Sequence, residues 1–439
     1  MSRVLLCNPP APRPTMRDYY CSSTSKAGYA WQPIDLLVQG AWLKDEHALI
    51  WRDFAVTPAT PDEALRTLVA DKPEVIVGLV GAAAPDDFAF WRAAQTRTGA
   101  RLFLSGDLAR FAARQTLADH DFVAGVLLDF TTPGLRDLLA GGEPVGVTLR
   151  DRDEPPPSQS EFAYPLPPHE LAWALPYRHP FLPAGFATVM TDHGCPHHCR
   201  YCNSGAVGWR ERSRENLAAE LAWLADRDRR ALFLKDMTFN ADPAHTMAVL
   251  DLLRRTGPWR FVCYVRPDRI DDEMAAAMKS AGCVMAMAGL ESGEDDVLQT
   301  VRPGASVETA VTGVRRLHRA GVPVGGHFLL GLPGETEAAL EKTLALARRL
   351  PLAYASFNLA TPRIGTPLFT DGAGVADGSA AKTRLPAGAL PRETLLAGRK
   401  KAVRGFYGRP SYLLRQAWRA GRQGLFFRQL RHGLTLLRG

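Results

Sequence analysis

The segment TDHGCPHHCRYCNSG, residues 191–205, places three of the seven cysteines of the chain within eight positions. Cys195, Cys199 and Cys202 follow the spacing C-x3-C-x2-C. Cysteine thiolates bind zinc and iron–sulfur clusters, and chance seldom puts three of them on one tight loop. The segment therefore indicates a metal centre rather than three unrelated buried thiols.

Two kinds of centre are compatible with three cysteines. A zinc site needs a fourth ligand, which His193, His197 or His198 would supply in a Cys3His set. Structural zinc loops seldom lie directly after a strand of a β/α barrel, which is the position that the strand pattern of the chain predicts for this segment. We therefore expect these histidines to lie at the surface or beside the ligands without binding metal. A [4Fe–4S] cube held by three cysteines leaves one iron without a protein ligand, and a small chelating molecule can complete its coordination. The segment favours the cluster.

Six apolar runs separated by helical patterns begin just before the cysteines. They are residues 187–191, 231–234, 260–265, 284–290, 322–330 and 355–360. Strands that alternate with helices in this way form parallel sheets, and six such units predict a partial (β/α)6 barrel of the TIM type. Chemistry in such barrels takes place at the carboxyl ends of the strands, where the cysteines would lie.

The first 145 residues show the same alternation with five apolar runs, at 4–6, 48–51, 75–79, 102–105 and 123–128. They predict a doubly wound, flavodoxin-like α/β domain whose ligands lie beyond the carboxyl ends of the strands. Asn8, Ser105 and Gly106 stand at such ends and are candidates for cofactor contact. The predicted division is a first domain (1–145), a Pro-rich extended linker (146–182), a barrel (183–370), and a C-terminal loop with basic helices (371–439).

The cysteine spacing, with Tyr201 just before the last cysteine, resembles that of the radical S-adenosylmethionine (SAM) enzymes. In that family the amino and carboxylate groups of SAM chelate the open iron. An electron from the cluster then cleaves the sulfonium, and a 5′-deoxyadenosyl radical abstracts hydrogen from the substrate. The resemblance implies that Cys195, Cys199 and Cys202 bind a [4Fe–4S] cluster and that a donor such as flavodoxin or ferredoxin reduces it.

Two motifs end the second and fourth predicted barrel strands, where the family contacts SAM. KDMTF, residues 235–239, loosely matches the segment that contacts the SAM amino group, with Asp236 as the candidate. GLESG, residues 289–293, resembles the family's G-x-E-S-G, in which Glu291 would accept hydrogen bonds from the ribose hydroxyls, next to Ser292.

Two more motifs follow the fifth and sixth strands. FLLGLPGET, residues 328–336, resembles the family's adenine-side F-x-x-G-x-P-G-E-T, with Gly331 and Pro333 as candidate contacts. TPRIGTP, residues 361–367, resembles P-x-x-G-T-P. Motifs in this order at successive strand ends are specific together, although each alone has an ordinary explanation as a turn or a helix cap. No residue is assigned a catalytic role.

The opening VLLCNPP and the later WQPIDLLVQGAWL resemble the cobalamin-binding domain of one radical SAM subclass. The subclass is similar to the anaerobic Mg-protoporphyrin IX monomethyl ester cyclase and to hopanoid-modifying enzymes. The resemblance implies cobalamin without a histidine ligand from the protein, because His47 stands at the wrong end of the predicted sheet. Where relatives carry a Gly-Glu-Gly-Glu-like turn, this chain has DFTTPG at 129–134, which would weaken cobalamin binding.

The C-terminal tail is strongly basic. From Arg399 onward the chain has eleven Lys or Arg and no Asp or Glu, so that the remainder is mildly acidic despite the net charge of +7. Apolar residues recur at near-helical spacing over 413–437, a pattern typical of a helix on an anionic membrane surface, an RNA-binding helix or a helix packed on the barrel. We expect a cytoplasmic protein without a nucleic acid partner. The basic tail is compatible with peripheral contact with a membrane.

The resemblance implies an enzyme that methylates an unactivated carbon of a hydrophobic small molecule, or that oxidises or cyclises it. One alternative is a tRNA methylthiotransferase, which shares the barrel but needs a second cysteine trio that Cys7 and Cys21 do not supply. The other is a non-catalytic cobalamin or redox sensor, which would not need the SAM motifs.

Overall fold

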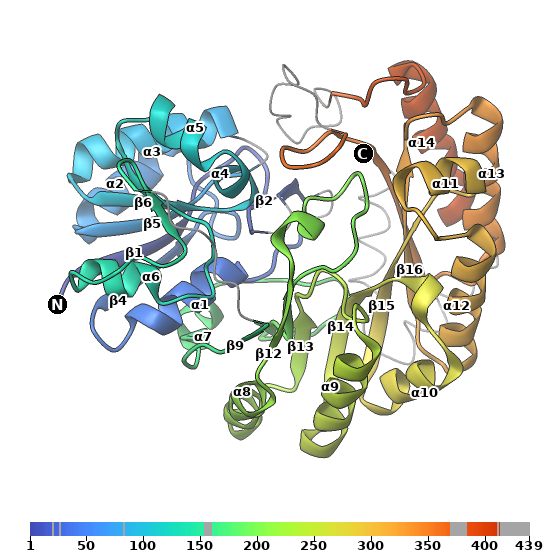
Figure 1. Cartoon of the computed structure of the whole chain (residues 1–439), viewed down its shortest axis with the longest axis horizontal. Helices are drawn as coiled ribbons and strands as arrows, with labels where there is room; N and C mark the ends of the chain where they lie inside the picture. Colours follow the sequence, from blue (N-terminus) through green and yellow to red (C-terminus); the bar gives the residue numbers. More distant parts are fainter. Residues whose placement is uncertain are drawn as a thin grey trace.

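The computed structural model describes residues 1–19, 22–25, 28–81, 84–152, 160–368, 384–410 and 412. Within them lie two six-stranded sheets and two small sheets of three and two strands, the latter formed by β2 (Thr15–Met16) and β3 (Ser23–Thr24). Figure 1 shows the first large sheet with its helices on the left and the second, with helices along its outer side, on the right. The two α/β units face each other across the centre of the molecule.

The first large sheet has the strand order β4-β1-β5-β6-β7-β8. Its strands are β1 (Arg3–Asn8), β4 (Ala48–Asp53), β5 (Val75–Leu79), β6 (Arg101–Ser105), β7 (Val123–Leu127) and β8 (Val147–Leu149). All five predicted strands are present and parallel, and β8 adds an antiparallel edge. The strand order reverses between β1 and β5, so this sheet is doubly wound and its ligand crevice is expected at their carboxyl ends.

Helices cover both faces of this sheet. The helices α2 (Pro61–Asp71), α3 (Ala84–Thr98) and α5 (Ala113–Asp119) share a core cluster with Leu5 and Cys7 of β1. The helices α1 (Ile34–Leu43) and α6 (Gly134–Leu139) share another with Val4 and Leu6. Successive side chains of a strand point to opposite faces, so burial on both sides requires the nearly continuous apolar run of β1. A short helix, α4 (Asp107–Phe111), follows β6 directly.

The second large sheet has its six parallel strands in consecutive order. They are β10 (Ala187–Val189), β13 (Ala231–Leu234), β14 (Arg260–Val265), β15 (Cys283–Glu291), β16 (Val324–Leu330) and β17 (Tyr354–Leu359), each within two residues of its prediction. The connecting helices are α8 (Arg214–Asp226), α9 (Pro243–Thr256), α10 (Asp272–Ser280), α11 (Asp295–Val301), α12 (Val307–Arg319) and α13 (Glu337–Arg349), and α14 (Arg392–Tyr407) packs beside α13 and β17.

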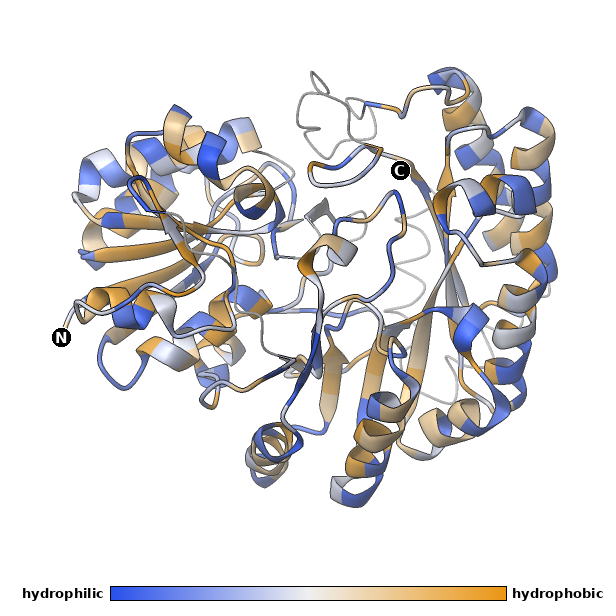
Figure 2. Cartoon of the chain, viewed as in Figure 1, coloured by the Kyte–Doolittle hydropathy of each residue, from blue (hydrophilic) through white to orange (hydrophobic). Residues whose placement is uncertain are grey.

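The two faces of the second sheet differ in burial. The face toward the helices is apolar and buried, as in Val324, Phe328 and Leu330 of β16. The opposite face carries half-buried side chains such as Tyr264 and His327, which alternate with the buried ones along the strands. The inner face is therefore partly open to solvent. In Figure 2 the strands of both sheets are mainly coloured hydrophobic, and the helices carry hydrophilic residues on their outer sides.

A small sheet with the order β11-β12-β9 lies at the carboxyl end of β10. The hairpin strands β11 (Asp192–Gly194) and β12 (Trp209–Arg212) enclose the cysteine loop, and β9 (Glu161–Phe162) pairs with β12. The predicted strand 187–191 thus ends early at Val189, because the chain turns there into the hairpin.

Residues 146–182, expected to be an extended linker, contribute β8 to the first sheet, β9 to the small sheet and α7 (His169–Trp173). Phe162 and Tyr164 are buried, and His169 accepts or donates a 2.6 Å hydrogen bond with Glu220 of α8. The segment therefore ties the two large sheets together. The prolines at 155–157 lie outside the described residues.

The helices of the described residues are all too short or too polar to cross a membrane. The predicted basic helices beyond Tyr412 lie outside the described residues.

Gly194 has room for no side chain. Its φ is +83°, and a Cβ there would overlap the carbonyl oxygen of Gly208 across the hairpin. Gly208 has a similar φ of +79°, but its Cβ would meet nothing within 4 Å. We predict that Gly194→Ala lowers the free energy of unfolding by more than the ~1 kcal/mol expected from backbone strain alone, as measured by denaturant unfolding.

Gly208→Ala is the matched control, since it has the strain without the overlap. Equal losses in the two variants would show that the contact between the hairpin strands does not restrict residue 194.

Candidate functional site

The three cysteines sit on one compact loop. The Cys195 N–H donates to Gly208 O at 2.9 Å, and the Cys202 N–H donates to Cys199 O at 3.0 Å, which closes the loop between the second and third cysteine. Cys195 is buried, and Cys199 and Cys202 are half-buried. The structure therefore brings together the three residues that the sequence singled out.

A hydroxyl group lies beside each of two of the sulfurs. The hydroxyl of Thr238, after β13, lies 3.6 Å from the Cys195 sulfur, and the Ser204 hydroxyl lies 3.3 Å from that of Cys202. Backbone N–H groups of His197 and Ser204 also lower the pKa values of these two thiols, but burial prevails and raises the pKa of Cys195 to about 11. Burial therefore disfavours the thiolate form of these two residues.

The donor set fits an iron–sulfur cluster. Hydrogen bonds to sulfur are a usual means of tuning such clusters, and this loop offers them. Among the described residues, no three His, Cys, Asp or Glu side chains converge at the spacing that a single metal ion requires.

The histidines of the segment occupy three different environments. His198 is exposed and His197 is half-buried. His193 is 1% exposed, so of the two expected positions, at the surface or beside the ligands, it does not take the surface one. Its ring packs against Tyr19, Phe130 and Phe162, and burial lowers its pKa to about 3, which keeps the ring neutral.

Glu291, the predicted ribose contact at the end of β15, is held by two neighbours. Its Oε1 accepts hydrogen bonds of 2.9 Å from both Tyr201 and Arg302, and Arg302 also donates to Gly289 O at 2.9 Å. The backbone of Glu291 has a φ of +59°, a conformation that costs a non-glycine residue about 1–3 kcal/mol. Arg302, which the sequence reasoning missed, thus holds the carboxylate of this residue with a strained backbone beside the cysteine loop.

The other candidates on this side have mixed placements. Ser292 is buried with its hydroxyl 3.4 Å from that of Thr343 in α13. Gly331 has a φ of +85°, and its N–H donates to Glu335 at 2.6 Å. Pro333 is half-buried on the same loop. A role of these residues in binding cofactor stays a prediction.

Asp236, the predicted amino-group contact, has both oxygens engaged by the turn that follows β10. Its Oδ1 accepts the N–H groups of Thr191 at 2.6 Å and Asp192 at 3.0 Å, and its Oδ2 accepts the Thr191 hydroxyl at 2.9 Å. The structure therefore gives Asp236 a positioning role at the entry to the cysteine loop.

Asp192 is a buried carboxyl that the sequence reasoning missed. It is 0% exposed, and neither oxygen meets hydrogen-bond geometry with a described group, the neighbouring Trp209 N–H included. Burial raises its pKa well above the usual value, and the charge of Asp236 adds to the effect. Burial and the charge of Asp236 therefore both favour the protonated form of Asp192.

A small apolar cluster joins the strand ends. Tyr201 of the cysteine loop and Leu329 pack against a buried group that includes Val301, Leu332 and Ala360. These residues come from the segments after β10, β15, β16 and β17, so the carboxyl ends that carry the motifs converge on one place.

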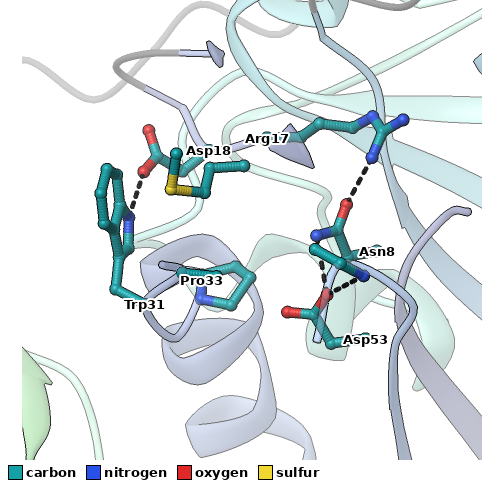
Figure 3. A pocket seen from close by; sticks show the side chains of 9 residues that line it. Asn8, Arg17, Asp18, Trp31, Pro33 and Asp53 are labelled. Atoms are coloured by element: carbon teal, nitrogen blue, oxygen red, sulfur yellow. Dashed lines mark hydrogen bonds between the residues drawn. The ribbon is translucent and has the colours of Figure 1, made fainter. Parts of the chain in front are cut away.

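The carboxyl end of β1 in the first sheet is filled by the chain itself. The Asn8 side chain donates to Asp53 at 2.8 Å, and Arg17 donates to Asn8 at 3.0 Å while its buried ion pair with Asp87 is 2.6 Å long. Figure 3 shows Asn8, Arg17 and Asp53 around a small pocket that Trp31 also lines. The crevice between β1 and β5 is therefore occupied by Arg17.

The residues at the end of β6 also make internal contacts. The hydroxyl of Ser105 donates to Asp35 at 2.7 Å, and both side chains are fully buried. Gly106 has a φ of +113°, and a Cβ there would overlap the carbonyl oxygen of Val80. Asn8, Ser105 and Gly106 stand at the predicted strand ends, but the two side chains make internal hydrogen bonds.

Buried polar contacts join the two α/β units. Arg210 of β12 pairs with Asp129, and its Nη2 lies 3.1 Å from the Thr131 hydroxyl and 3.2 Å from His193 Nδ1. Residues 129–134, noted as a departure from cobalamin-binding relatives, therefore form a contact with the hairpin that leads into the cysteine loop. A second buried ion pair joins Lys235 and Asp18 at 3.3 Å.

Comparison with known proteins gives one family and several relatives. Residues 190–347 match the model of the radical SAM superfamily. The chain is 28% identical over 225 residues to the uncharacterized methyltransferase PH0819 of Pyrococcus horikoshii. The aligned region covers 50% of this chain and 49% of that protein. It is 29% identical over 200 residues to the tRNA-2-methylthio-N(6)-dimethylallyladenosine synthase of Clostridium novyi. That aligned region covers 42% of this chain and 43% of that protein. The chain thus spans about half the length or less of these curated relatives.

Two kinds of solved structure share the fold over more of the chain. The radical SAM methyltransferase TsrM from Kitasatospora setae, with cobalamin and a [4Fe–4S] cluster bound, has a TM-score of 0.64 at 17% identity over 84% of this chain and 77% of that one. The cobalamin-dependent SAM radical enzyme OxsB, with aqua-cobalamin and SAM bound, has a TM-score of 0.69 at 13% identity over 98% and 72%.

Asp236→Asn is predicted to destabilise the cysteine loop. An amide in place of the carboxylate cannot accept all three hydrogen bonds, and the loss of one buried bond costs about 1–3 kcal/mol. We expect a lower free energy of unfolding in denaturant and less iron bound after reconstitution. Asp192→Asn is the control, because it changes a neighbouring buried carboxyl whose oxygens meet hydrogen-bond geometry with no described group. If both variants lost equal stability, the positioning role of Asp236 would be wrong.

Glu335 is predicted to make stability depend on pH. Burial raises its pKa from 4.5 to about 7, so the folded state holds a proton that the unfolded state releases between these values. The ionised form therefore costs stability as pH rises from about 4.5 to 7, by at most about 3 kcal/mol. Glu335→Gln should match the wild type in Tm at pH 5 and exceed it at pH 8. An equal difference at both pH values, or one matched by the exposed variant Glu337→Gln, would contradict this.

Proposed function

We propose that this chain, a radical SAM enzyme, is a cobalamin-dependent methyltransferase that modifies an unactivated carbon of a partly apolar small molecule. The carrying observation is the convergence of four motif-bearing strand ends: the cysteine loop with Tyr201, the Glu291–Arg302 pair, the loop 331–335 and Ala360. Three cysteines without a fourth ligand among the described residues would leave a place for SAM beside these residues.

Each part of the site has a role in this proposal. Cys195, Cys199 and Cys202 would hold the cluster, and Thr238 and Ser204 would donate hydrogen bonds to two of its thiolates. Arg302 and Tyr201 hold Glu291, whose second oxygen would be available to ribose. When bound, the cluster and SAM supply a 5′-deoxyadenosyl radical and cobalamin supplies the methyl group. A flavodoxin or ferredoxin would be the electron donor.

Two features of the first domain bear on cobalamin binding: the side chain in its crevice and the positions of its histidines. Arg17 fills the crevice at the β1–β5 crossover, so a nucleotide tail has no room there. His47 and His120 precede β4 and β7, at the amino ends of the strands, so neither can reach the carboxyl ends to bind cobalt. TsrM and OxsB, which share the fold, have cobalamin bound.

The inner face of the second sheet supports a substrate that is partly apolar. Tyr264, His327, Leu329, Ser356 and Asn358 are half-buried on this face, and they mix aromatic, aliphatic and amide groups. The rings of Phe233 and Tyr264 lie 5.9 Å apart, and those of Tyr264 and His327 lie 6.1 Å apart. Such a surface suits a hydrophobic molecule with a few polar groups.

The two alternatives lack comparable support. A tRNA methylthiotransferase would need a second cysteine trio, and Cys7 is fully buried in the core under α2 and α3. Cys21 lies outside the described residues. A sensor without catalysis would not need Glu291 to be held in a strained conformation beside the cysteine loop.

Product analysis tests the proposal. The full chain is reconstituted anaerobically with iron, sulfide and cobalamin, then given reductant and SAM. We expect 5′-deoxyadenosine from reductive cleavage and S-adenosylhomocysteine from methyl transfer to cobalt, and Cys199→Ala should abolish the first. Cys283→Ala, in a thiol outside the loop, is the control and should keep it.

Three results would count against the proposal. Absence of 5′-deoxyadenosine would contradict radical chemistry. Deoxyadenosine without S-adenosylhomocysteine would instead favour oxidation or cyclisation. Failure to retain cobalamin in gel filtration would remove the methyl-transfer part.

A further inference from the structure

Arg110 on α4 has a buried guanidinium nitrogen, Nη1, for which no described residue supplies a hydrogen-bond acceptor. The side chain as a whole is half-buried. Its charge lies over the ring of Tyr19, at 4.8 Å from the centroid, and near that of Phe111 at 5.4 Å. Burial lowers its pKa to about 10, although the nearby charge of Asp129 opposes this shift. A group of this kind is costly unless an anion accompanies it.

The position of α4 is the second observation. The helix follows Ser105 and Gly106 at the carboxyl end of β6, and it also contacts the second unit. Asp107 pairs with Arg363 at 3.4 Å, and a Cβ at Gly365 would overlap the ring of Phe111. The loop after β17 therefore rests on α4, and Arg110 stands where the carboxyl ends of both large sheets meet.

The nearby carboxylates already form ion pairs with other arginines. Asp129 pairs with Arg210 and accepts two hydrogen bonds from Thr131. Asp107 pairs with Arg363. Asp129 also attracts the charge of Arg110 and raises its pKa, whereas Arg210 repels that charge and lowers the pKa. This corner thus holds more positive charge than its own acids neutralise, between the cysteine-loop hairpin and the first domain.

We propose that Arg110 binds an anionic oxygen, of a phosphate or a carboxylate, on a ligand held between the two α/β units. The inference rests on the proposed function for the identity of that ligand, which is either cobalamin, through its phosphodiester, or the substrate. A guanidinium is suited to this task because its planar donors match the oxygens of both groups.

The first experiment separates the two sources with corrinoids. Binding of hydroxocobalamin and of cobinamide, which lacks the phosphodiester and nucleotide, is measured by absorbance titration of the cluster-reconstituted full chain. If cobalamin supplies the anion, Arg110→Gln weakens hydroxocobalamin binding by about tenfold or more and leaves cobinamide binding unchanged. If the substrate supplies it, both corrinoids bind wild type and variant equally.

The second experiment uses inorganic phosphate as the probe and thermal unfolding as the readout. Millimolar phosphate should raise the Tm of the corrinoid-free wild type and not that of Arg110→Gln. Loading with hydroxocobalamin should abolish the phosphate effect in the wild type if cobalamin fills the site, and preserve it if the substrate does. Sodium chloride at equal ionic strength controls for general screening.

Variants distinguish ligand binding from a structural role. Without ligand, Arg110→Gln should leave Tm unchanged or raise it, because an unpaired buried charge is removed. Arg110→Lys should retain part of the phosphate effect. Arg92→Gln, which removes an exposed arginine of α3 in the same domain, should retain all of it.

Two outcomes would overturn the proposal. One is a phosphate effect that persists in full in Arg110→Gln. The other is a marked fall in the Tm of the ligand-free variant, which would assign Arg110 to packing on Tyr19. A wild type that binds neither corrinoid would contradict the proposed function alone, since the phosphate arm needs no corrinoid.

Discussion

The carboxylate of Asp236 determines where the site is built. It stands at the end of β13 and accepts three hydrogen bonds from Thr191 and Asp192, the residues at which the chain leaves β10. Three donors on one buried acceptor pair fix the direction of that turn. The β11–β12 hairpin, the cysteine loop inside it and the distance between the cysteines and the other strand ends all depend on this direction.

The same hairpin also attaches the first domain. Arg210 and His193 project from its two strands onto Asp129, Phe130 and Thr131 after β7. A side chain two residues before the first cysteine is therefore part of the contact between the two units. Breaking a buried ion pair of this kind by removing one partner costs about 3–5 kcal/mol, so the relative placement of the two sheets is coupled to the cysteine loop.

Much of this arrangement could be predicted from the sequence, and the rest depended on contacts between distant segments. The eleven predicted strands of the two sheets are present, and most of them are short, mainly apolar runs that alternate with helical patterns. The burial of His193 could not be predicted, because its neighbours Tyr19 and Phe130 belong to another domain. Asn8 and Ser105 were placed at the correct strand ends, but their partners Asp53 and Asp35 follow no local pattern. Arg302 and Asp192 lacked a motif altogether.

The central claim is that three cysteines hold a cluster with one iron open to SAM. Electron paramagnetic resonance of the reduced, reconstituted chain tests it most directly, with and without SAM. The account predicts a [4Fe–4S] signal whose shape changes when SAM is added, because SAM becomes a ligand of the open iron. A signal that is identical with and without saturating SAM would contradict the account.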